Sequence, residues 1–134
     1  ILEEMCVPLD KGWTDFVYCD RYERVPGGTT TRVNLREFNI FDLIAVGTMM
    51  RRKIVLEVGG YRDLFWEEYD LYIRYLLKNN QPPYHIPRPL FTYSIRGSSL
   101  TSDSRKVDQG WSELKGLWPI DTLERFGRLP DVVN

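Results

Sequence analysis

The segment from Gly59 to Arg74 constrains the fold of this 134-residue chain more than any other stretch. It begins with two glycines, continues through a short aromatic loop, and enters a helical pattern whose first turns carry Glu67, Glu68 and Asp70. Apolar residues at helical spacing predict one buried stripe on a helix from about residue 67 to 79, and the Asn-Asn and Pro-Pro pairs that follow predict its end. Such a loop, leading into acids at a helix start, can hold a carboxylate rigidly at the edge of a cleft.

The stripe predicted to be buried consists of Tyr69, Tyr72, Ile73 and Leu76. Elsewhere the patterns alternate: helical at 1–9, extended at 14–20 and 29–35, helical turns at 40–46, extended at 47–52, helical at 53–58, extended at 84–87 and 90–95, and a helical tail from 104 to 126 that Gly110, Gly116 and Pro119 interrupt. Alternating strands and helices predict an α/β fold. A chain of this length supports one domain, residues 1–134, with a core from 1 to 103 and a helical tail from 104 to 134.

Composition narrows the classes of function. The net charge is −1, which does not favour nucleic-acid binding, since such proteins usually carry a basic excess. No apolar run approaches the roughly 18 residues of a membrane span. Two cysteines, Cys6 and Cys19, are too few for a disulfide framework or a metal site, and they favour a reducing compartment.

The acids at the start of the predicted helix have two readings on spacing alone. Asp70 and Arg74 are four residues apart, so they can pair along the helix surface for a few tenths of a kcal/mol. Acids in the first turn also stabilise a helix through its dipole, and this requires no catalytic role. Glu67 and Glu68 point about 100° apart around the helix. One of them can therefore face a cleft while the other caps the helix or faces solvent.

Several other residues are candidates for binding. Asp20 ends a predicted strand, where it can contact an acceptor or a metal, or cap a turn, which is the commoner role. His85, the single histidine, lies on a predicted strand, where a packed histidine is commoner than a ligand. Aromatic residues make up 13% of the chain and either fill cores or line carbohydrate sites. The tryptophans are Trp13, Trp66, Trp111 and Trp118.

In their order and spacing, several short motifs resemble the catalytic domain of family 2 glycosyltransferases. They are Phe16–Asp20, Met50–Arg52, Gly59–Tyr61, Glu67–Glu68, Asp70–Arg74 and a proline-bearing strand pair at 86–90 and 93–96. The similarity runs from about residue 15 to 101. It implies a partial GT-A-like fold, a mixed sheet with flanking helices. It also implies transfer of a sugar, with inversion, from a nucleotide diphosphate donor to a hydroxyl acceptor.

The resemblance assigns roles to individual residues. The second acid of the pair is the catalytic base in this family, and that position is Glu68, where relatives usually carry aspartate. Glu67, Asp20, Trp66 and Arg96 are implied to bind substrate, with Asp70 mainly structural. Arg96 stands where many relatives have a histidine that helps to hold metal. Because arginine stays protonated, it is not a metal ligand. It can act on the departing diphosphate instead, or be a surface residue of a Ser-Gly-rich loop.

The resemblance also implies what these 134 residues do not contain. GT-A enzymes bind the nucleotide on an N-terminal half and hold a divalent metal, Mn²⁺ or Mg²⁺, with an Asp-x-Asp motif, and this sequence has no Asp-x-Asp. We therefore expect the donor-binding half to precede Ile1 and the isolated chain to be inactive, because transfer requires donor positioning as well as a base. We also expect an exposed sheet edge that pairs with the missing half or with a second copy.

For the parent enzyme, the resemblance implies a nucleotide-sugar donor and a glycan or lipid-linked acceptor. It also implies a cytoplasmic location, including a peripheral position at the inner membrane face. Two other classes of function stay open at this point. One is a non-catalytic interaction protein that retains half of the fold, and the other is a carbohydrate-binding module built on the tryptophans.

Overall fold

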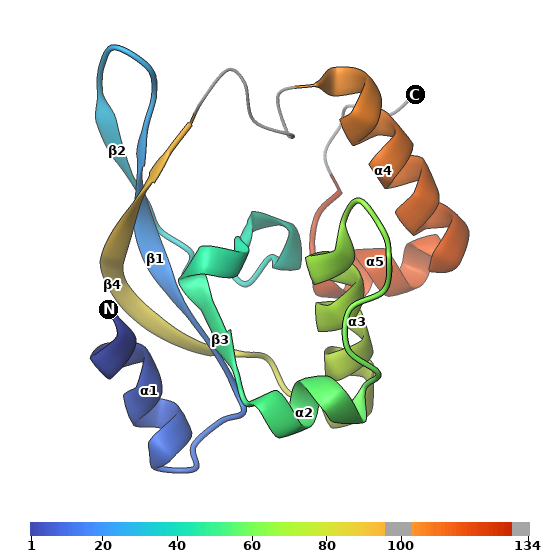
Figure 1. Ribbon diagram of the computed structural model, residues 1–134, viewed down its shortest axis with the longest axis horizontal. Helices are drawn as coiled ribbons and strands as arrows, with labels where there is room; N and C mark the ends of the chain where they lie inside the picture. Colours follow the sequence, from blue (N-terminus) through green and yellow to red (C-terminus); the bar gives the residue numbers. More distant parts are fainter. Residues whose placement is uncertain (96–102, 130–134) are drawn as a thin grey trace.

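The computed structural model describes residues 1–95 and 103–129 (Figure 1). Its elements are α1 (Leu2–Asp10), β1 (Phe16–Arg24), β2 (Thr30–Val33), the 3₁₀ helices η1 (Ile40–Asp42) and η2 (Ala45–Gly47), β3 (Thr48–Met50), α2 (Arg52–Glu57), α3 (Glu67–Asn79), β4 (Tyr84–Ser94), α4 (Ser104–Leu117) and α5 (Ile120–Phe126). The strands form one open, mixed sheet with helices beside it. The predicted α/β class is confirmed.

Strand β1 lies at the centre of the sheet. Its first half pairs antiparallel with β3 and its second half pairs antiparallel with β2, while β4 runs parallel along its other side. The two short strands predicted at 84–87 and 90–95 are one strand, β4. Its register against β1 shifts on both sides of Asp20, opposite the stretch that holds Pro87 and Pro89. Because proline has no N–H to donate to a ladder, the irregularity lets pairing continue past it.

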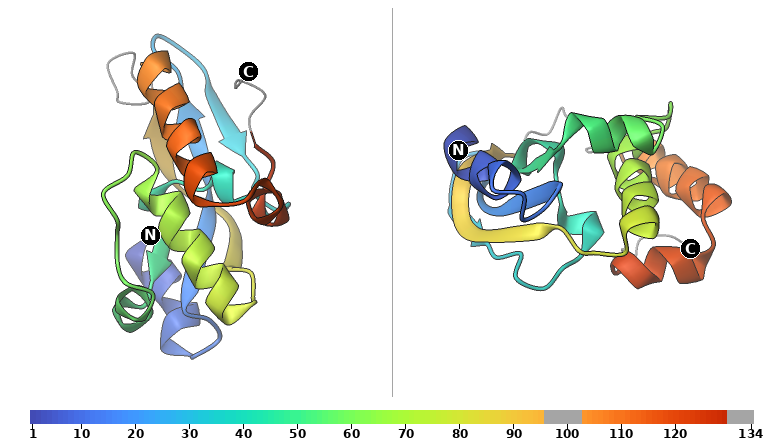
Figure 2. Two further views of the ribbon diagram at one scale, coloured as in Figure 1. Left: turned by 90° about the vertical axis from the view of Figure 1, so that its right-hand side faces the viewer. Right: turned by 90° about the horizontal axis from the view of Figure 1, so that it is seen from below.

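Two groups of apolar side chains form the core. A small one joins α1 to the sheet through Met5, Leu9, Val17 and Cys19. The larger one joins β1 to α3, α4 and α5, and includes Phe16, Tyr72, Trp111, Leu114 and Leu123. Accordingly, α1 lies at one end of the molecule and α4 and α5 lie at the other (Figures 1 and 2). The helical tail, as far as residue 129, therefore shares its core with the sheet.

Helix α3 begins and ends where the sequence predicts. The predicted stripe of four side chains is buried, and Leu71 and Tyr75 are buried as well. The buried surface is wider than one stripe because α4 and α5 contribute Trp111, Leu114 and Leu123 to the same cluster. Asn80 ends the helix in the left-handed conformation, with φ 52°, which asparagine tolerates better than most residues.

The helical turns predicted at 40–46 are the two separate 3₁₀ turns η1 and η2. A further difference from the sequence expectation concerns α4. Helix α4 continues through Gly110 and Gly116, and the break before α5 falls at Pro119. Glycine lowers helix propensity without ending a helix, whereas proline cannot supply the N–H that a helix interior requires.

Candidate functional site

Asp70 is the structural acid of the three at the start of α3. Its carboxylate is fully buried and accepts hydrogen bonds from Arg62, including one from Nε at 2.8 Å, from Arg74 Nε at 3.1 Å, and from Trp118 Nε1 at 2.9 Å. Burial alone would raise the pKa of Asp70, but the hydrogen bonds from Arg62 and Trp118 and the charge of Arg74 hold this pKa below its usual value. Asp70 and Arg74 therefore pair as predicted, but in the interior and not along the helix surface, because α4 and the preceding loop enclose the carboxylate.

The same network fixes the glycine turn that precedes the helix. Gly59 and Gly60 have φ of 98° and 70°, a conformation that glycine adopts without steric cost. Arg74 donates from its two terminal nitrogens to the carbonyl oxygens of Val58 and Gly60. One arginine thus ties the turn to α3 while it also binds Asp70. The loop that leads to Glu67 and Glu68 is held at both ends.

Glu68 lies in a hollow of about 210 Å³. The hollow is lined by residues from three separate segments: Leu43, Ile44, Ala45 and Val46 around η1 and η2, Trp66, Glu68 and Tyr69 at the start of α3, and Tyr93 near the end of β4. Most of this lining is apolar or aromatic. The fold therefore places one carboxylate in a small space between aliphatic and aromatic side chains.

The Glu68 charge affects the neighbouring phenols. Burial raises the pKa of Tyr69, and the Glu68 carboxylate raises it further. Burial also raises the pKa of Tyr61, and the charges of Glu68 and Glu67 raise it further. These tyrosines stay protonated, and Tyr69 donates its hydroxyl to the Phe41 carbonyl oxygen at 2.9 Å. Among the residues that line the hollow, the one charged side chain is the Glu68 carboxylate.

Trp66 and Glu67, two of the predicted substrate-binding residues, lie beside Glu68. Trp66 lines the hollow, and its ring stacks on Tyr69 with centroids 5.0 Å apart. Its indole Nε1 is buried without a hydrogen-bond partner in the described residues. Glu67 is half-buried and does not belong to the lining. Arg96, predicted to act on the diphosphate, lies outside the described residues.

Asp20 is far more enclosed than the sequence indicates. The strand continues through it to Arg24, so Asp20 is not at a strand end, and its side chain has no exposed surface. It binds His85 Nε2 at 2.7 Å, the Leu35 N–H at 2.9 Å and Arg32 at 3.4 Å. Burial by itself would raise the pKa of Asp20, yet these partners lower it. Turn capping at a strand end is therefore the wrong role for this residue.

His85 is packed, as expected for a single histidine on a strand. It stacks on Tyr18 with ring centroids 4.8 Å apart while it binds Asp20. Burial, and then the charge of Asp20, raises the pKa of Tyr18 to about 12. Sequence reasoning missed this pair. The signal was an acid and a histidine on two predicted strands, but only the register of β1 against β4 brings them together.

The described residues do not form a metal centre. Across 1–95 and 103–129, no three His, Cys, Asp or Glu side chains gather closely enough to hold an ion. Asp20 and His85 have atoms that can bind a metal, but Asp20 Oδ1 and His85 Nε2 form a hydrogen bond with each other. Within the same ranges, none of the helices has the length and apolar character needed to cross a membrane.

The tryptophans have different surroundings. Trp111 is 3% exposed and belongs to the core, and Trp118 donates to Asp70. Trp13, which is 55% exposed, lies between α1 and β1 and packs against Tyr84 at 5.7 Å. Trp66 is thus the tryptophan that lines the hollow of Glu68. Two of the four side chains on which a carbohydrate-binding module would rely stabilise the fold instead.

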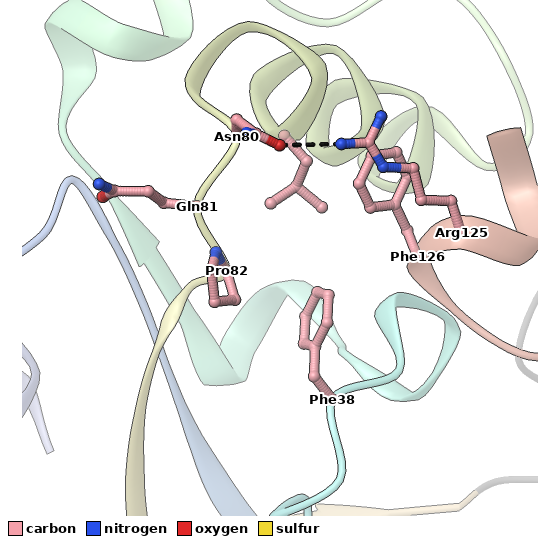
Figure 3. Close-up of a pocket in the computed structure, with 7 residues that line it drawn as sticks. Phe38, Asn80, Gln81, Pro82, Arg125 and Phe126 are labelled. Carbon is pink, nitrogen blue, oxygen red and sulfur yellow. Dashed lines mark hydrogen bonds between the residues drawn. The ribbon is translucent and has the colours of Figure 1, made fainter.

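A second hollow lies at the other end of α3 (Figure 3). It also measures about 210 Å³ and is lined by Phe38, Leu76, Asn80, Gln81, Pro82, Arg125 and Phe126. Arg125 donates to the Asn80 side-chain oxygen at 2.8 Å, and the Gln81 side chain points away from Arg125 and Phe126 (Figure 3). This lining contains no carboxylate or histidine to accept a proton. The hollow of Glu68 is therefore the better candidate for catalysis.

No protein-family model matches this chain, and no curated protein matches it in sequence.

Proposed function

We propose that this chain is the acceptor-side part of a nucleotide-sugar-dependent, inverting glycosyltransferase that resembles family 2, with Glu68 as the general base. One observation carries the proposal: the acids at the start of α3 have different surroundings. Asp70 is enclosed by two arginines and a tryptophan, whereas Glu68 lines a small hollow with aromatic side chains. A carboxylate at a fixed helix start, beside a space that an acceptor can enter, is what proton abstraction from a hydroxyl requires.

In the proposed reaction, the acceptor hydroxyl attacks the anomeric carbon of the donor sugar from the face opposite the diphosphate. A bond forms between the acceptor oxygen and the anomeric carbon as the bond from that carbon to the diphosphate oxygen breaks. The hydroxyl proton moves to Glu68, and the nucleoside diphosphate leaves. Transfer requires the carboxylate within about 2.6–3.2 Å of the acceptor oxygen. Trp66 and Tyr93 give the acceptor ring apolar surfaces in this position.

In this proposal, the donor is bound by a separate half of the enzyme. We infer from the resemblance that a nucleotide-binding half with an Asp-x-Asp motif and Mn²⁺ or Mg²⁺ completes a GT-A-like fold. Arg96 would stabilise the departing diphosphate. The isolated chain would be inactive, and the whole enzyme would act in the cytoplasm or at the inner membrane face on a glycan or lipid-linked acceptor.

The test is Glu68→Gln in a protein that contains both this chain and the donor-binding half. The substitution keeps the size of the side chain but removes the proton acceptor, so kcat for transfer should fall about 100-fold or more, within the usual range for a general base. The matched control is Glu124→Gln on α5, an exposed glutamate outside the hollow of Glu68, which should leave kcat unchanged. Transfer that persists undiminished in the Glu68→Gln protein would reject the assignment of the base.

A second test concerns the donor half. The coding sequence upstream of the Ile1 codon should contain an in-frame strand–helix pattern with an Asp-x-Asp motif. A start codon directly before Ile1 would instead favour an interaction protein that retains half of the fold.

A further inference from the structure

The hollow of Glu68 has a chemical character that selects among acceptors. Its lining contains one charged side chain, Glu68 itself, and no lysine or arginine from the described residues. The rest consists of four aliphatic residues from 43 to 46 and the rings of Trp66, Tyr69 and Tyr93. A phosphate or carboxylate site is usually built from arginines, lysines or backbone N–H groups. The charge in the lining of this hollow is instead negative and comes from Glu68.

Three arginines around Tyr69 and Asp70 already have partners for their guanidinium groups. Arg21, whose charge lowers the pKa of Tyr69, donates to the Asp42 carbonyl oxygen at 2.7 Å and lies 3.8 Å from the Glu23 carboxylate. Arg62 and Arg74 both bind the buried Asp70 carboxylate. Arg74 also donates to two loop carbonyl oxygens, so it is held in place. Burial is the main reason that the pKa of Tyr69 and of Tyr61 is raised, and the Glu68 carboxylate raises both further, while Arg21 lowers that of Tyr69. An anionic group brought into the hollow would meet the same carboxylate.

We propose that the acceptor in this hollow is an uncharged sugar ring, bound by its apolar C–H face against Trp66 and Tyr93, and that a phosphate or carboxylate on that ring weakens its binding. This inference rests on the proposed function, because it names the substrate class of the same site. Aromatic faces suit the C–H side of a sugar ring, and the hollow is smaller than the roughly 300–1,000 Å³ of drug-sized pockets. One ring fits this space.

The test measures binding to the 134-residue chain by NMR, with the Trp66 indole signal as the reporter. The probes are methyl glycosides of glucose, galactose, mannose and N-acetylglucosamine. Each is paired with an anionic partner, the matching uronide or 6-phosphate. At least one neutral glycoside should shift the Trp66 signal, and its anionic partner should bind at least tenfold more weakly at low salt. The gap should narrow at 0.5 M salt, where screening acts over a few ångströms.

Two variants separate charge from shape. Glu68→Gln removes the charge and keeps the side-chain size, so the affinities of the neutral and anionic partners should converge. Glu124→Gln makes the same change on α5, outside this hollow, and should leave the difference intact. An anionic glycoside that binds as tightly as its neutral partner would overturn the inference, and so would a Trp66 signal that no neutral glycoside shifts.

The failure of this inference can be told apart from the failure of the proposed function. If Glu68→Gln abolishes transfer but phosphorylated rings bind best, Glu68 is the base and the acceptor class is wrong. If neutral rings bind in the hollow but Glu68→Gln leaves transfer unchanged, the binding site stands and the base assignment is wrong.

Discussion

Asp70 shows how much one buried carboxylate can organise. It joins the loop residue Arg62, the helix residue Arg74 and the α4-adjacent Trp118, so three segments meet at one side chain. Asp70→Asn would leave two guanidinium groups without their shared anion. Removing one partner from a buried ion pair typically costs 3–5 kcal/mol, and since Arg62 is 45% exposed we expect about 3 kcal/mol here. Urea unfolding of the two proteins measures the difference.

The control for this substitution is Asp63→Asn in the same loop. Asp63 is exposed, so the same chemical change should alter the free energy of unfolding by less than about 0.5 kcal/mol. Equal effects at the two positions would mean that the Asp70 network does not stabilise the fold.

The two buried aspartates also predict how stability depends on pH. Burial acts to raise the pKa of Asp20 and of Asp70, but their hydrogen-bond partners lower both below the usual value. A carboxyl whose pKa is lower in the folded protein stabilises it fully above the unfolded pKa, about 3.9, and this stabilisation is lost as pH falls through the folded value. The free energy of unfolding should therefore fall steeply below about pH 4.

Urea unfolding at a series of pH values down to the acid transition checks this prediction. In Asp20→Asn the slope below pH 4 should become shallower, because one of the two responsible carboxyl groups is gone. A slope unchanged by this substitution would show that Asp20 binds protons equally well in the folded and unfolded chain.

The sequence predicts the residue types at these positions better than their contacts. Three acids at a helix start were visible, and so was the histidine on a strand. The burial of Asp70 depends on Trp118, which is 48 residues away, and the pairing of Asp20 with His85 spans 65 residues. Such contacts depend on how elements pack, and no local pattern encodes them.

At the scale of elements, α4 is fitted closely to the loop before α3. A Cβ atom on Gly110 would lie 2.4 Å from Phe65 Cδ1 and 3.0 Å from Phe65 Cβ. The adjacent carboxylate of Glu113 accepts a hydrogen bond from the Phe65 N–H at 3.0 Å. Gly110→Ala should therefore displace the loop and destabilise the protein by about 1–3 kcal/mol, as overpacking usually does.

Gly116 provides the matched control on the same helix. No atom lies within 4 Å of a Cβ built there, so Gly116→Ala should raise stability by about 0.5–1 kcal/mol through better helix propensity. Thermal unfolding of the two variants checks both the predicted loss of stability in Gly110→Ala and the predicted gain in Gly116→Ala. If Gly110→Ala raises the melting temperature as well, α4 does not pack against the loop as closely as described.

Local patterns predict the helices better than the strand pairing. Both ends of α3 are marked in the sequence, by the acids at Glu67 and by the Asn-Asn and Pro-Pro pairs after Lys78, and both are confirmed. The sequence predicts that Gly110 interrupts a helix, but in the structure this residue is a position of close approach to Phe65. The sequence cannot distinguish these two uses of glycine, because the neighbour that requires it lies in another element.

At the scale of the whole molecule, β2, β3 and β4 each pair only with β1, so all three lie at edges of the described sheet. Strand β2 carries the charged Arg32. Strand β4 borders β1 on one side, and it carries Pro87, Arg88 and Pro89. Natural edge strands often carry prolines and charged residues, which hinder pairing with other chains. Strand β3 borders the first half of β1 on the other side and consists of Thr48, Met49 and Met50, without proline or charge. The β3 edge is therefore the better surface for a further strand.

We predict that the isolated chain associates along β3, either with a second copy or with the proposed donor-binding half. Light scattering at micromolar concentration should show a species larger than 15.8 kDa. Hydrogen exchange should then slow with rising protein concentration at the amides of β3 and stay unchanged at those of β4, because β4 contains residues that hinder pairing. A monomeric peak would contradict association, and protection confined to β4 would place the interface on the other edge. Strand β3 is followed in the chain by α2 and the Gly59–Gly60 turn, which lead to Glu68. A partner that pairs with β3 would therefore contact the segment that precedes the proposed base in the chain.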